Sequence, residues 1–276
     1  MTNIFELMTE PFQYDFMLRA LMVSIVIGVL CPMVGSYVVT RRLAFMGDAL
    51  SHTVLPGLVL GYILGMNPLL IAIPSCVITA VMIGYLSKRT GLTEDTSIGI
   101  LLAGMFALGL AMISMFGGPN VGLEEILLGE ILGVSQQDVW ITFTICSITL
   151  VALYLFHKEL VFNSFDPQGA SVIGLPSTFL DYLLLILVAL VVVASIQAVG
   201  VVLMLAMLVI PAATAYLIAK RFIHMMLIGS AIGVSVSISG IYISYFLDLP
   251  SGTAMTLVSV IIFTIVATLR PAKSRT

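Results

Sequence analysis

Long apolar stretches recur along almost the whole chain and are separated by short polar segments. Each stretch has about 18 to 22 residues, the length with which an α-helix crosses roughly 30 Å of bilayer hydrocarbon. A transmembrane β-barrel would instead show short segments of alternating polarity. The pattern therefore predicts an all-α fold, a polytopic bundle of nine transmembrane helices. The predicted spans are residues 18–40, 48–65, 68–87, 96–115, 138–156, 180–196, 200–219, 225–246 and 252–269.

The chain is predicted to form one transmembrane domain over residues 1–276, since no internal repeat or low-complexity linker divides it. A count of eight spans, with one segment re-entrant, is the alternative. Composition supports a membrane protein, because 60% of the residues are apolar and only 9% are charged. A water-soluble domain of this length could not expose such a surface, so we expect the lipid bilayer to surround it.

Basic residues fall on one side of the predicted topology. If residues 41–47 lie in the cytoplasm, only Arg19 among the 11 lysines and arginines lies outside it, while Glu124, Glu125 and Glu130 lie on the outer face. Short cytoplasmic loops are enriched in lysine and arginine. We therefore expect a multi-pass protein with its N-terminus outside and its C-terminus in the cytoplasm.

One carboxylate and one imidazole stand out within the predicted spans. Asp48 and His52 are four residues apart, so on a helix they lie about 40° apart around the axis and about 6 Å apart along it. Ionisable groups are costly inside a bilayer and by default mark a functional site. A carboxylate oxygen and a neutral imidazole nitrogen together suit manganese, iron or zinc, whereas magnesium and calcium sites are usually built of oxygen alone.

Two ligands are too few for a transition metal, but a homodimer closing on a two-fold axis would double the pair Asp48 and His52 to four. The alternative is that Asp48 caps the N-terminus of the second span and His52 is a hydrogen-bonded core residue. The cysteines lack the paired spacing of a disulfide or a thiolate metal site, so we expect core residues. They are Cys31, Cys76 and Cys146.

Gly200 and Pro211 bracket a segment with two possible structures. Its helix is either broken, which exposes backbone groups to a transport pathway, or bent by a tolerated proline kink.

Two long motifs carry a resemblance to a known family. Residues 41–57, RRLAFMGDALSHTVLPG, resemble the signature of the manganese, zinc and iron permeases of the ABC importer superfamily, and residues 199–215, VGVVLMLAMLVIPAATA, resemble that family's other long motif. The resemblance covers roughly residues 20–270, with one departure at Thr53, where a small residue such as alanine is expected. It implies a type II ABC importer-like fold in the bacterial cytoplasmic (inner) membrane. It also implies that the chain is the permease subunit of an importer for a divalent transition metal.

The resemblance implies three protein partners and no nucleic acid. They are a second copy of the chain, separate cytoplasmic ABC ATPase subunits and an extracytoplasmic metal-binding protein. The sequence contains no Gly-Lys dipeptide and therefore no P-loop, so we expect a transport subunit without enzymatic activity or a permanently bound cofactor. In such permeases a short cytoplasmic helix docks into the ATPase. The matching residues for ATPase coupling are Phe165, Asp166, Pro167 and Gly174, an ordinary interfacial helix being the alternative.

Manganese is the expected cargo. A zinc system often carries a histidine-rich outer loop, whereas residues 116–137 contain no histidine. A zinc or iron importer of the same family is the alternative. A gradient-driven secondary metal transporter fits the composition, but the two motifs and the coupling segment disfavour it. Glu124, Glu125 and Glu130 are candidates for attracting cations or contacting a basic patch on the delivery protein.

Overall fold

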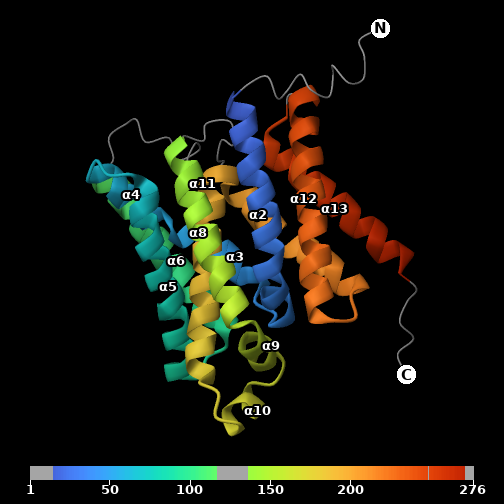
Figure 1. The fold of residues 1–276 in the computed structure, drawn as a ribbon. Helices are drawn as coiled ribbons and strands as arrows, with labels where there is room; N and C mark the ends of the chain where they lie inside the picture. The colour runs from blue at the N-terminus through green and yellow to red at the C-terminus, as the bar shows by residue number, and fades with distance from the viewer. Residues whose placement is uncertain (1–14, 117–135, 248, 271–276) are drawn as a thin grey trace.

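A computed structural model describes residues 15–116, 136–247 and 249–270. Regular structure in these ranges is helical, with no strand, which confirms the all-α prediction. The helices, labelled as in Figure 1, are α2 (Asp15–Thr40), α3 (Ala44–Thr53), α4 (Leu55–Ile63), α5 (Pro68–Thr90), α6 (Glu94–Phe116), α8 (Gln136–Leu155), α9 (His157–Phe165), α10 (Pro167–Val172), α11 (Ser177–Ile218), α12 (Phe222–Leu247) and α13 (Ser251–Leu269).

Helix α2 packs closely against α11 and α12 through glycines. A Cβ atom at Gly233 of α12 would collide with the carbonyl oxygen of Gly28, and one at Gly35 would collide with the carbonyl oxygen of Leu208 in α11. Small residues allow membrane helices to approach with their backbones, and dispersion contacts then stabilise the bundle where no hydrophobic effect acts between helices. These glycines therefore fix the distance between α2 and its two neighbours.

The prediction of nine spans is wrong, and so is the alternative of eight. Six helices in the described ranges are long and apolar enough to cross a bilayer. A seventh span results if Val139–Leu155 and His157–Phe165, which meet at an angle of 71°, are counted as one broken span. Residues 48–65 and 200–219 fail under either count, and the predicted span 138–156 counts only when it is joined to His157–Phe165.

Residues 48–65 contain two short helices in place of one span. Helix α3 has 10 residues and α4 has 9, so each is about 14 to 15 Å long and neither crosses the bilayer alone. Val54 separates them, and Pro56 lies at the start of α4. Proline has no N–H to donate and its ring clashes with the preceding turn, so a new helix begins here.

Residues 200–219 begin at a break within α11. Gly200 has φ 79° and ψ 168°, a conformation outside the helical region that is open essentially only to glycine. The helix after the break, Leu203–Ile218, is shorter than a span. Pro211 lies inside that helix. The break at Gly200 confirms the interpretation of a broken helix, while exposure of backbone groups to a pathway stays a prediction.

Candidate functional site

The turn between α2 and α3 sets the direction of α3, the short helix that carries the two predicted metal ligands. Arg42 has a left-handed φ of 62°, and the N–H of Leu43 donates to the carbonyl of Val38 at 2.8 Å. Helix α3 then buries Met46 and Leu50 completely. The opposite face of the same short helix carries Asp48 and His52.

The two sequence motifs pack against each other at this helix. A Cβ atom at Gly47 would lie 2.7 Å from Cδ2 of Leu208 and 3.8 Å from Cδ1 of Leu205. Gly47 belongs to the first motif, and both leucines belong to the second. Helix α3 therefore packs against the part of α11 that follows the break at Gly200.

Asp48 and His52 lie side by side, as their spacing predicts. Asp48 Oδ1 is 3.7 Å from His52 Nε2, and the side chains are 40% and 31% exposed, respectively. The imidazole also contacts the ring of Phe106 edge to face, with centroids 5.6 Å apart. The carboxylate oxygen and Nε2 therefore lie next to each other on the less buried side of α3.

The alternative roles of the pair do not fit the geometry. The N-cap of α3 is Leu43, so Asp48 does not cap this helix. Nδ1 of His52 is buried and has no hydrogen-bond partner among the described residues, so His52 is not a hydrogen-bonded core histidine. Nε2 is the imidazole nitrogen that lies toward Asp48.

One chain supplies only part of a metal coordination shell. No group of three or more His, Cys, Asp or Glu side chains suited to a metal occurs in the part of the chain that the structure describes. Transition metals take four to six ligands, so Asp48 and His52 need further donors to bind an ion tightly. The cysteines supply none, because Cys31, Cys76 and Cys146 are each buried and unpaired, as expected of core residues.

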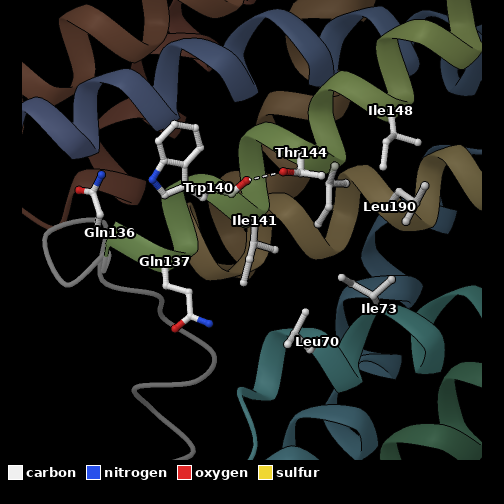
Figure 2. Close-up of a pocket in the computed structure, with 10 residues that line it drawn as sticks. Leu70, Ile73, Gln136, Gln137, Trp140, Ile141, Thr144, Ile148 and Leu190 are labelled. Carbon is white, nitrogen blue, oxygen red and sulfur yellow. Dashed lines mark hydrogen bonds between the residues drawn. The ribbon is translucent and has the colours of Figure 1, made fainter.

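A mostly apolar groove lies away from this pair, between α5, α8 and α11 (Figure 2). Its volume is about 690 Å³, with Gln136 and Gln137 at one end. Thr144 Oγ1 is hydrogen-bonded within α8, to the carbonyl of Trp140 at 2.8 Å. Among the residues that the structure describes, no acidic, basic or histidine side chain lines the groove, so these residues add no charged ligand for a metal.

The predicted cytoplasmic helix is present as α10, at the end of the bundle where α5 ends and α11 begins (Figure 1). Asp166 is its N-cap, accepting a hydrogen bond from the N–H of Gly169 at 2.8 Å, and Pro167 occupies the first turn. Gly174 follows the helix with φ 86°. Three of the four predicted coupling residues therefore shape this helix or its end.

The surface of this segment is apolar and exposed. Phe165, Val172 and Ile173 are 64%, 85% and 65% exposed. All three lie in residues 165–175, the segment that the sequence matched to the ATPase-docking helix, although Phe165 alone among them was named as a coupling residue. Glu124, Glu125 and Glu130, predicted to attract cations or contact a partner, lie outside the described residues.

Comparison with known proteins gives concordant matches. The chain matches the ABC 3 transport family over residues 13–270. It is 40% identical to the manganese transport system membrane protein MntC of Halalkalibacterium halodurans, over 95% of this chain and 90% of that protein. It is 39% identical to the chelated iron transport system membrane protein YfeD of Yersinia pestis, over 100% of this chain and 93% of that protein. A solved structure of PsaBC from Streptococcus pneumoniae in complex with Fab has a TM-score of 0.86 at 35% identity, covering 97% of this chain and 96% of that one.

Proposed function

We infer the function of this protein from its family: the chain belongs to the ABC 3 transport family. It is a multi-pass membrane permease and a transport subunit, not an enzyme. We propose that it imports a divalent transition metal into the bacterial cytoplasm and that manganese is its principal cargo. The observation that carries this proposal is the 40% identity to a manganese transport membrane protein over 95% of the chain. The similar relative named for chelated iron makes iron the alternative cargo, with zinc behind it.

We propose that Asp48 and His52 coordinate the metal ion in transit. Metal bonds of about 2.1 Å to a carboxylate oxygen and an imidazole nitrogen would place the two ligand atoms about 3.0 to 3.4 Å apart. The observed separation is 3.7 Å. A small side-chain rotation would therefore bring both atoms onto one ion, and the partly exposed position of the two side chains supports a cargo site.

A second copy of the chain is proposed to complete the coordination shell. Two-fold symmetry would place two carboxylates and two imidazoles around the axis, and water or backbone carbonyls would supply further ligands. The exposure of Asp48 and His52 at the edge of α3 supports this, because a pair enclosed within one chain could not meet its symmetry mate.

We propose that α10 docks on a separate cytoplasmic ATPase subunit and that an extracytoplasmic protein delivers the metal. Phe165, Val172 and Ile173 provide the apolar docking surface. The basic residues Arg41 and Lys88 lie at the ends of α2 and α5, on the α10 side of the bundle. The positive-inside rule supports placing this side in the cytoplasm, with the N-terminus outside and the C-terminus inside.

The mode of energisation is tested by reconstituting the permease, its ATPase and its delivery protein in lipid vesicles. Manganese uptake is expected to require hydrolysable ATP and to continue after ionophores have collapsed the ion gradients. Uptake that requires an ion gradient and does not depend on ATP would contradict the proposal and favour a secondary transporter.

A further inference from the structure

Arg41, directly after α2, links two other helices at the α10 side of the bundle. Its side chain is 12% exposed, and its Nη1 donates to Asp181 Oδ1 of α11 at 2.9 Å. Its Nε donates to Ser164 Oγ at 3.1 Å, and its Nη2 donates to the carbonyl oxygen of Asn163 at 3.3 Å. Both acceptors lie in α9, so one guanidinium connects the end of α2 with α9 and α11.

The carboxylate of Asp181 accepts hydrogen bonds from two further side chains. Lys88 Nζ of α5 donates to its Oδ2 at 2.8 Å, and Asn163 Nδ2 donates to its Oδ1 at 2.9 Å. Its carboxylate therefore contacts donors from α5 and α9 as well as Arg41. Asn163 thus joins α9 directly to α11, and the contacts from Arg41 to α9 are the ones that connect α9 with the end of α2.

The cluster lies between the two functional segments. Ser164 comes shortly before Asp166, the N-cap of α10. Arg41 comes shortly before Ala44, where α3 begins. A displacement of α10 by a docked partner would move the end of α9, and the contacts of Arg41 would carry that displacement to the start of α3.

We propose that Arg41 is a positioning residue that couples movement of α10 to the orientation of Asp48 and His52. The inference rests on the proposed docking of α10 on the ATPase. A guanidinium suits this role because its donors lie in one rigid plane, so a movement of the α9 acceptors shifts the whole group. The left-handed turn at Arg42 lets α3 change direction just after the link.

The Arg41→Lys substitution tests the hydrogen bonds to α9 separately from the positive charge. It keeps the positive charge beside Asp181, but its single ammonium group cannot reproduce the planar fork that reaches Asn163 and Ser164 together. Lys88 of α5 offers a matched control. It pairs with Asp181 as Arg41 does, but it has no hydrogen bond to α9 among the described residues.

The test measures manganese ions taken up per ATP hydrolysed, in vesicles that contain the permease, its ATPase and its delivery protein. Wild type is compared with Arg41→Lys, Arg41→Ala and Lys88→Gln, and ATPase binding and melting temperature are recorded for each. We expect Arg41→Lys to bind the ATPase and hydrolyse ATP as the wild type does, but to take up about tenfold less manganese per ATP. Lys88→Gln is expected to keep the wild-type ratio.

An unchanged ratio in Arg41→Lys would overturn the inference. If Arg41→Ala then lowered only the melting temperature, Arg41 would be a stabilising residue and nothing more. An equal fall of the manganese-to-ATP ratio in Lys88→Gln would also overturn the inference, because Lys88 has no hydrogen bond to α9 in the described ranges and the loss could then not be assigned to the contacts between Arg41 and α9. A wild-type protein without ATP-dependent manganese uptake would instead refute the proposed function, and the coupling role with it.

Discussion

Asp48→Ala and His52→Ala are each expected to abolish metal uptake while leaving the fold intact. Asp48 makes no side-chain hydrogen bond within its helix, and its Oδ1 is 3.7 Å from His52 Nε2, beyond hydrogen-bond distance. Both side chains are partly exposed. Each substitution should therefore change the free energy of unfolding by no more than about 0.5 kcal/mol.

The expected loss in the free energy of metal binding is much larger than this loss in stability. At an effective dielectric constant of about 20, two unit charges about 4 Å apart attract by about 4 kcal/mol, and desolvation offsets part of this. For the carboxylate lost in Asp48→Ala, a net loss of about 3 kcal/mol corresponds to roughly 100-fold weaker binding. In a two-fold assembly each substitution also removes a ligand from both copies.

The assay is ATP-dependent manganese uptake in reconstituted vesicles, with the melting temperature of the purified permease measured alongside. Asp95→Ala is the matched control, because it removes an exposed carboxylate in the first turn of α6, eleven residues before Phe106, the α6 residue whose ring contacts His52. We expect its uptake to match the wild type. Wild-type uptake in either Asp48→Ala or His52→Ala would end the assignment of these residues as metal ligands.

Three further predictions concern α10 and the helix packing. A thiol reagent should label Ser171→Cys only from the cytoplasmic side, and labelling from outside intact cells would reverse the proposed orientation. Val172→Asp should weaken ATPase binding by at least tenfold in a pull-down titration, since burying a valine contributes about 1.5 kcal/mol or more; unchanged binding would remove this residue from the docking surface. Gly233→Val should lower stability by about 1 to 3 kcal/mol, because its Cβ collides with the carbonyl of Gly28, whereas Gly99→Ala, which meets open space, should not; equal melting temperatures would contradict the packing argument.

Apolar run length was enough to predict the helical class and most of the spans, because bilayer thickness sets the length of a crossing helix. It could not show where the backbone leaves the helix inside an apolar run. Gly200 interrupts such a run with a positive φ, and Val54 separates two helices that together have the length of one span. Mean hydropathy does not reveal either break, although the sequence contains Gly200 at the first and Pro56 next to the second.

The proximity of Asp48 and His52 was predictable because both residues lie on one short helix and helical spacing alone brings them together. The cluster around Asp181 was not predictable in this way. Its partners Arg41 and Lys88 are 140 and 93 residues away along the chain, so only the fold brings them to it. A carboxylate one residue inside a predicted span, residues 180–196, was the one available signal.

The identity of the cargo is the central claim, and it is tested most directly by comparing manganese and zinc at matched free-ion concentrations. The vesicles contain the permease, its ATPase and its delivery protein. A site of carboxylates and imidazoles binds zinc more tightly than manganese, so tight binding should stall zinc within the pathway. We predict net uptake of manganese, with zinc acting as a competing inhibitor that is released poorly. Zinc carried inward faster than manganese would contradict the manganese assignment and establish zinc as the cargo.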